Sequence, residues 1–274
     1  MEEIEITYNI NFDEKYYKNY QDIILDIFKN NNLNCDLNDD KILNILGLYY
    51  DIKIKDYEKM KKYYLMAIEV NNVDAMYNLA DYYKNVEKNY DEMKKYYLMA
   101  IELNHSGSMN NLGYYYKNFE NNYDEMKKYY LMAIEFNDEC SMNNLGCFYR
   151  DIEKNYDKMK KYYLMAIELN NVDAMNNLGL YYRNIEKNYD KMTKYFLMAI
   201  KLNNKLSLDN LCGFYEKEIQ HYLLRQLNST IAVEKVKELE KNNFLGVKIF
   251  KELTEYCFNP QRLLKLCNDY MDII

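Results

Sequence analysis

Few side chains in this chain could perform chemistry. His105 and His221 are its only histidines, which is too few for a His-based triad or a Cys/His metal site. We find no Gly-rich phosphate loop, no GxGxxG and no GxSxG motif. The cysteines form no CxxC pair, a pattern typical of reduced core thiols; they are Cys35, Cys140, Cys147, Cys212, Cys257 and Cys267. We therefore expect no catalytic residue, no metal, no cofactor and no enzymatic activity.

Amides and cations are the side chains that recur at fixed spacing. One row advances by 33 residues and contains Asn44, Tyr77, Asn110, Asn143, Asn176 and Asp209. A second row, seven residues further along, contains Asp51, Lys84, Lys117, Arg150, Arg183 and Glu216. Seven residues are two helical turns, so both rows would lie on one helix face. A variable position separates them, occupied by Leu48, Asp81, Tyr114, Cys147 and Leu180.

The two rows predict a groove that binds a partner protein. Amides can donate to and accept from an extended backbone, whereas Lys and Arg favour carboxylates or phosphates. The expected partner is thus an extended acidic segment, held by Asn44, Tyr77, Asn110, Asn143, Asn176, Lys84, Lys117, Arg150, Arg183 and Tyr114. The alternative is that Asn is simply abundant and that Lys and Arg near helix ends interact favourably with the helix dipole. An adjacent column of Asn at positions 78, 111, 144, 177 and 210 keeps this alternative open.

A 33-residue repeat carries these rows. The string MKKYYLMAIE begins at Met60, Met93 and Met126, with a close copy at Met159 and a looser one at Met192. A second motif keeps the same step, at Leu46-Gly47, Leu79-Ala80, Leu112-Gly113, Leu145-Gly146, Leu178-Gly179 and Leu211-Cys212. Two motifs in one register predict tandem copies of one structural unit.

Each copy is predicted to form two helices. In the third copy, Met109, Leu112, Gly113 and Tyr116 make one apolar stripe, and a second helix runs from about residue 124 to residue 135. This second helix is apolar nearly all round and therefore needs neighbours on more than one side. We expect an all-α, right-handed alpha-alpha superhelix (solenoid) of stacked helix pairs.

Small residues and asparagines have predicted structural roles within the copy. Gly113 on the first helix and Ala133 on the second would let two backbones approach closely. Asn104, Asn137 and Asn170 stand where a left-handed residue commonly ends a helix, a conformation that Asn tolerates well.

These residues carry a family resemblance. The run AMNNLGLYY at residues 174–182 resembles the first helix of tetratricopeptide and Sel1-like repeats. The eight-residue step from Ala166 to Ala174 is similar to the Sel1 pattern, with Asn170 in place of its glycine, while the ten residues from Tyr182 to Met192 are near tetratricopeptide length. The resemblance implies a protein-interaction scaffold. With its composition, the chain also resembles repeat proteins of large DNA viruses that infect amoebae.

The repeats define the expected domains. Residues 41–216 would hold about five full copies and a partial sixth, residues 1–40 an N-terminal helical cap, and residues 217–274 a C-terminal cap or interaction module. In the last segment, Pro260-x-x-Leu263-x-x-Leu266 resembles the short boxes through which viral repeat proteins recruit ubiquitin ligases. A substrate adaptor for a ubiquitin ligase is therefore the alternative function.

Charge and composition restrict the partners further. A net charge of −7 and a pI of about 5.2 argue against nucleic acid as the main ligand. No window approaches the roughly 18 apolar residues of a membrane span, and the N-terminus has neither the basic start nor the apolar run of a signal peptide. We expect a cytoplasmic protein, in the host cytoplasm if it is viral. The sequence leaves homo-oligomerisation open.

Overall fold

A computed structural model describes residues 39–214, and all the regular secondary structure in this range is helical. The chain divides into two compact units, Met1–Ala133 and Ile134–Ile274, which are treated separately below. The predicted caps and the segment around Pro260 lie outside the described residues, apart from the N-terminal residues 39 and 40.

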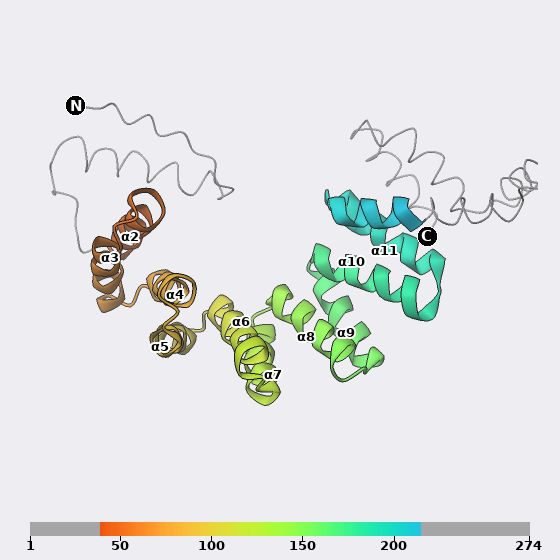
Figure 1. The fold of residues 1–274 in the computed structure, drawn as a ribbon, viewed down its shortest axis with the longest axis horizontal. Coiled ribbons are helices and arrows are strands. Elements are labelled where there is room, and N and C mark those ends of the chain that lie inside the picture. The colour runs from red at the N-terminus through yellow and green to blue at the C-terminus, as the bar shows by residue number, and fades with distance from the viewer. Residues whose placement is uncertain (1–38, 215–274) are drawn as a thin grey trace, which may run out of the picture. The chain divides into compact units, whose positions relative to one another are not determined.

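The first unit contains consecutive helix pairs (Figure 1). Its helices are α2 (Asp40–Tyr49), α3 (Tyr57–Glu69), α4 (Val73–Tyr82), α5 (Tyr90–Glu102), α6 (Ser106–Tyr115) and α7 (Tyr123–Glu135), the last of which runs two residues beyond the unit. Within it, α2 packs on α3, α4 packs on α5, and α3 also packs on the following helix α4. Each helix pair therefore buries its apolar surface against its own partner and against the next copy.

The second unit repeats this arrangement. Its helices are α8 (Glu139–Asp151), α9 (Tyr156–Glu168), α10 (Val172–Tyr181) and α11 (Tyr189–Lys201), followed by helical residues 205–214. Helix α8 packs on α9, α9 on α10, and α10 on α11. The all-α architecture of tandem helix pairs predicted from the repeat is confirmed.

The ends of the second helices behave as the sequence predicts. Asn104, Asn137 and Asn170 have φ angles of 64°, 58° and 64°, which confirms the left-handed helix stops. Asp91, Asp124 and Asp157 lie in the first turns of α5, α7 and α9, where negative charge suits the helix dipole.

The joint inside each copy contains a feature that the sequence did not predict. Four of the first helices end in a five-residue π-helical turn: η1 (Tyr50–Ile54), η2 (Tyr83–Glu87), η3 (Tyr116–Glu120) and η4 (Tyr182–Glu186). A left-handed residue follows each turn, at Lys55, Lys88, Asn121 and Lys187. In the fourth copy α8 instead remains α-helical through Asp151, and the left-handed residue is Lys154.

A buried aromatic ring lies across a small residue in each helix pair. A Cβ atom added to Gly146 of α8 would come within 2.6 Å of the Tyr163 ring on α9, and one added to Gly179 would come within 2.7 Å of the Phe196 ring on α11. Both rings have no exposed surface. In these two pairs glycine leaves room for the ring of the second helix beneath the first, and in the second copy Ala80 stands at this position beside an equally buried Tyr97.

This contact leads to a stability prediction. Gly146→Val should lower the free energy of unfolding by about 1–3 kcal/mol, because the new side chain must displace the enclosed Tyr163 ring. Gly213→Val is the matched control, since a Cβ atom there meets no atom of residues 39–214 within 4 Å. Urea unfolding followed by circular dichroism measures both changes. Equal losses for the two variants would contradict the packing argument.

A second contact joins successive copies at the surface. In the first unit, Glu87 of η2 accepts hydrogen bonds from Lys61 of α3 at 3.2 Å and from Tyr82 of α4 at 2.9 Å. In the second unit, Glu186 is bonded in the same way by Lys160 of α9 at 3.1 Å and by Tyr181 of α10 at 2.9 Å. Through these glutamates, η2 and η4 each link their own copy to the preceding copy.

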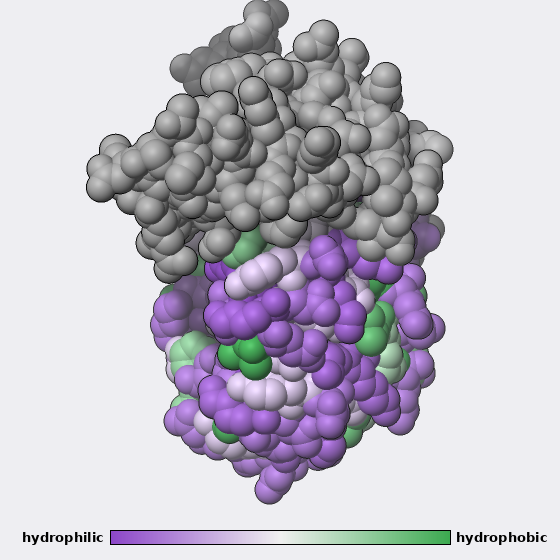
Figure 2. Space-filling view, turned by 90° about the vertical axis from the view of Figure 1, so that its right-hand side faces the viewer, coloured by the Kyte–Doolittle hydropathy of each residue, from purple (hydrophilic) through white to green (hydrophobic). Residues whose placement is uncertain are grey.

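Two further observations concern the surface. Cys140 is exposed in the first turn of α8, so the prediction of core thiols is wrong for this residue; Cys147 and Cys212 are partly buried. Figure 2 shows a face on which hydrophilic residues predominate and hydrophobic residues appear in small separate patches. Over residues 39–214, no helix combines the length and the hydropathy that a membrane span needs.

Candidate partner-binding site

The predicted amide row takes part in bonds between neighbouring copies. In the second unit, Asn177 Nδ2 of α10 donates to Asn143 Oδ1 of α8 at 3.0 Å. One copy later, Asn176 Oδ1 accepts from Asn210 Nδ2 at 3.0 Å and from Ser207 Oγ at 3.1 Å. In these two contacts the adjacent asparagine column supplies the donor to the row.

The same ladder exists in the first unit. Asn78 Nδ2 donates to Asn44 Oδ1 at 3.0 Å, and Asn111 Nδ2 donates to the Tyr77 hydroxyl at 3.2 Å. Asn110 holds the equivalent position on α6 and is half-buried. Within each unit, the ladder places the row residues of successive first helices on one continuous face.

The ladder also determines which polar atoms remain available. Asn143 and Asn176 use their Oδ1 atoms to accept bonds from the next copy, and their Nδ2 groups donate to no residue between 39 and 214. An amide nitrogen can only donate. In the second unit, Asn143 is half-buried and can offer its Nδ2 donor to a ligand, whereas Asn176 is only 5% exposed and serves mainly the contact between copies.

The variable position lies within this network. In the first unit the Tyr97 hydroxyl of α5 donates to Asp81 Oδ1, and Asn111 Nδ2 lies 3.2 Å from the same carboxylate. Burial raises the pKa of Tyr97, with the Asp81 carboxylate adding to the effect, and similarly raises the pKa of Tyr77 to about 12. Asp81 is thereby held by three neutral groups and makes this part of the face acidic.

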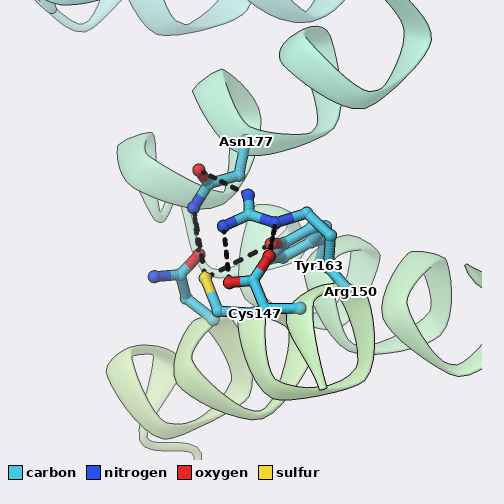
Figure 3. Close-up of polar contacts among 6 residues, drawn as sticks. Cys147, Arg150, Tyr163 and Asn177 are labelled. Carbon is cyan, nitrogen blue, oxygen red and sulfur yellow. Dashed lines mark hydrogen bonds and ion pairs between the residues drawn. The ribbon is translucent and has the colours of Figure 1, made fainter. Parts of the chain in front are cut away.

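Cys147 replaces this aspartate in the fourth copy (Figure 3). The Tyr163 hydroxyl lies 3.3 Å from its Sγ atom, and Asn177 Nδ2 lies 3.6 Å from it. Burial is the main cause of the raised pKa of Tyr163. The thiol carries no formal charge, so the fourth copy lacks the negative centre that Asp81 provides in the second.

Each of the three guanidinium nitrogens of Arg150, next to this thiol, donates a hydrogen bond. Its Nε donates to Asp151 Oδ1 at 2.7 Å and its NH2 donates to Asp151 Oδ2 at 3.0 Å, a two-point carboxylate contact. Its NH1 donates to Asn177 Oδ1 at 3.2 Å, as Figure 3 shows. The bonds to Asp151 raise the pKa of Arg150. This second-row cation therefore reaches the amide ladder but already holds a carboxylate.

Arg183 occupies the equivalent position one copy later with a different environment. Its Nε donates to Asn184 Oδ1 at 3.0 Å, and its two terminal nitrogens bond to no residue in the described range. Partial burial lowers its pKa, because a desolvated guanidinium has no facing carboxylate to compensate it. Arg183 is a cation with unused donors.

The other predicted residues are grouped in the first unit. Lys84 Nζ lies 5.5 Å from the centre of the Tyr114 ring, a cation–π contact between successive copies. Tyr114 is 45% exposed, and Lys117, which lies in η3, is half-buried. Neither Lys84 nor Lys117 forms an ion pair with a described residue, which distinguishes them from Arg150.

Sequence reasoning missed three contributors to this face: Asn177, Asp151 and Asn184. The asparagine column was the signal for the first, because an Asn kept beside the predicted row in every copy after the first, where Ile45 stands, was available to bond to it. The other two follow an arginine directly, a position that helical spacing does not place in the groove. Among the described residues, no three His, Cys, Asp or Glu side chains form a group suited to holding a metal ion.

The chain is similar to known repeat proteins. The family model of the tetratricopeptide repeat matches residues 141–173. The structure of a Sel1 repeat protein from Oxalobacter formigenes superposes with a TM-score of 0.61 at 22% identity, over 73% of this chain and 88% of that one. A protective antigen of uropathogenic Escherichia coli with an SLR fold superposes with a TM-score of 0.54 at 19% identity, over 93% of this chain and 55% of the antigen. Comparison with curated proteins finds no match.

These similarities support one conclusion about architecture. The chain has a Sel1-like, tetratricopeptide-like repeat fold, as the Leu-Gly motif and the 33-residue step predict.

Proposed function

We propose that the chain is a non-catalytic scaffold whose amide and cation rows hold an extended acidic segment of a partner protein. One observation carries the proposal. In the second unit the half-buried Asn143 accepts through Oδ1 and keeps its Nδ2 donor, next to a row that contains Arg150 and Arg183, of which Arg183 keeps two nitrogens without a partner in residues 39–214. Unused amide and guanidinium donors favour a ligand rich in carbonyl and carboxylate oxygens.

The net charge of the chain predicts how strongly such a ligand would bind and how binding would depend on salt. The chain has a net charge of −7, so a strongly acidic ligand is repelled at long range and must be retained by local contacts. Exposed charge pairs are screened over roughly 8 Å at physiological ionic strength. Binding should therefore be moderate in affinity and should weaken as salt is added.

The test uses the full chain and a fluorescein-labelled decaglutamate peptide. Changing both Arg150 and Arg183 to Glu should abolish binding, because two donors for carboxylates become two repelling charges. The control changes Lys158 and Lys161 to Glu, an identical change in charge at two exposed positions of α9. Fluorescence anisotropy measures binding, and circular dichroism checks that both variants stay folded. Loss of binding in the control, with retention in the arginine variant, would place the site elsewhere.

A further inference from the structure

Arg150 and Arg183 are equivalent positions of two successive copies, yet within residues 39–214 only Arg150 has a carboxylate partner. Asp151 follows Arg150, whereas Asn184 follows Arg183. Both side chains fold back onto the arginine before them, with Nε as the donor in each case, at 2.7 Å and 3.0 Å. The local geometry is thus the same, and the difference lies in the charge of the accepting group.

The two guanidinium groups therefore differ in how many of their nitrogens are already bonded. Asp151 takes two nitrogens of Arg150, and Asn177 takes the third. Asn184 takes one nitrogen of Arg183 and leaves two with no partner in residues 39–214. A carboxylate binds arginine best through two parallel hydrogen bonds, so a ligand can form that contact with Arg183 immediately.

We infer that Asp151 is a built-in competitor, which occupies Arg150 as a ligand carboxylate would and so makes Arg183 the anchor for an acidic segment. The inference rests on the proposed function. It also explains how a row of similar cations can select one register of a bound peptide, since a carboxylate placed at Arg150 must first displace Asp151.

Asp151 holds Arg150 weakly enough for a ligand carboxylate to displace it. Arg150 is 29% exposed and Asp151 is 49% exposed, so water reaches both partners. A pair of this kind contributes at most about 1 kcal/mol, which corresponds to about fivefold in an equilibrium constant. The asparagine at position 184 shows that the chain accommodates an amide in this location.

The test exchanges the two side chains in the full chain and measures decaglutamate binding by anisotropy. Asp151→Asn should tighten binding about fivefold to tenfold, because Arg150 becomes available and one repelling charge is lost. Asn184→Asp should weaken binding by about fivefold or more, because it installs the same competitor beside Arg183. Adding Arg150→Gln to Asp151→Asn should remove the gain.

Two control variants separate a local effect at Arg150 from a general effect of net charge. Asp157→Asn, on a 98% exposed side chain of α9, changes the net charge by the same amount and should leave binding within about twofold. If it tightens binding as much as Asp151→Asn does, the effect is one of net charge and the inference is overturned. If Arg183→Gln weakens binding while Asp151→Asn has no effect, the inference fails and the proposed function stands. If Arg183→Gln binds decaglutamate as tightly as the native chain, both are overturned.

Discussion

Tyr163→Ala is expected to lower the free energy of unfolding by about 3–5 kcal/mol, the loss typical of removing an enclosed aromatic ring. Tyr163 has no exposed surface, and its ring fills the space that Gly146 leaves open on α8. Its hydroxyl also bonds to Cys147. Alanine would leave a cavity between α8 and α9 that the two rigid helices cannot close. Urea unfolding of the full chain, followed by circular dichroism, measures the loss.

Two variants show whether the ring or the hydroxyl is responsible. Tyr163→Phe should cost only about 0.5–1.5 kcal/mol, the usual value of one hydrogen bond, and Phe196 holds the equivalent position in the next copy. Tyr162→Ala is the positional control, because this half-buried neighbour stacks on Tyr149 with ring centres 5.5 Å apart and encloses no glycine. If Tyr162→Ala is as harmful as Tyr163→Ala, the ring-under-glycine contact is not the main source of stability.

Alkaline pH is expected to unfold the protein between about pH 10 and pH 12. Burial, with nearby carboxylates adding to it, raises the pKa values of Tyr77, Tyr82 and Tyr181 to about 12. In the unfolded chain a tyrosine loses its proton near pH 10. Because the folded state holds these protons more tightly, its stabilisation is complete below about pH 10 and is lost as the pH rises through 12.

The size of this effect follows from the number of tyrosines concerned. A shift of one pKa unit corresponds to about 1.4 kcal/mol, so the Tyr77 phenol contributes about 2–3 kcal/mol that alkaline conditions remove, and Tyr82 and Tyr181 contribute less because solvent screens their interactions near the surface. Absorbance of tyrosinate against pH, with urea unfolding at each pH, measures both quantities. Tyr181→Phe should make the decline shallower, since one group that responds to pH is gone. Unchanged stability up to about pH 12 would contradict the prediction.

Most of the fold could be predicted because it depends on short-range patterns. A 33-residue step in two motifs is sufficient to identify helix pairs, and the left-handed stops at Asn104, Asn137 and Asn170 follow from the tolerance of Asn for that conformation. The π-helical turns could not be predicted. Their sequence differs little from that of an ordinary helix end, and a lysine occupies the left-handed position at Lys55, Lys88 and Lys187.

The candidate site was only partly predictable. The sequence identified the amide row and the cation row, because side chains seven residues apart share a helix face. It did not reveal that Asn177 would bond to Asn143 or that Asp151 would fold back onto Arg150. The first contact depends on how one helix pair stacks on the next, and the second depends on the rotamers of two adjacent side chains in α8, which helical spacing does not determine.

By itself, then, the sequence determined the local elements of this protein: which segments are helices, where they stop, and which side chains recur on one face. These properties arise from backbone preferences and from spacing within a single helix. The tertiary structure alone decided which polar atoms remain available to a partner. Packing of successive copies uses the Oδ1 atoms of Asn143 and Asn176, engages Arg150, and leaves donors on Arg183. The physical reason is that each hydrogen-bonding atom has few bonding positions, and neighbouring copies occupy some of them before any ligand binds.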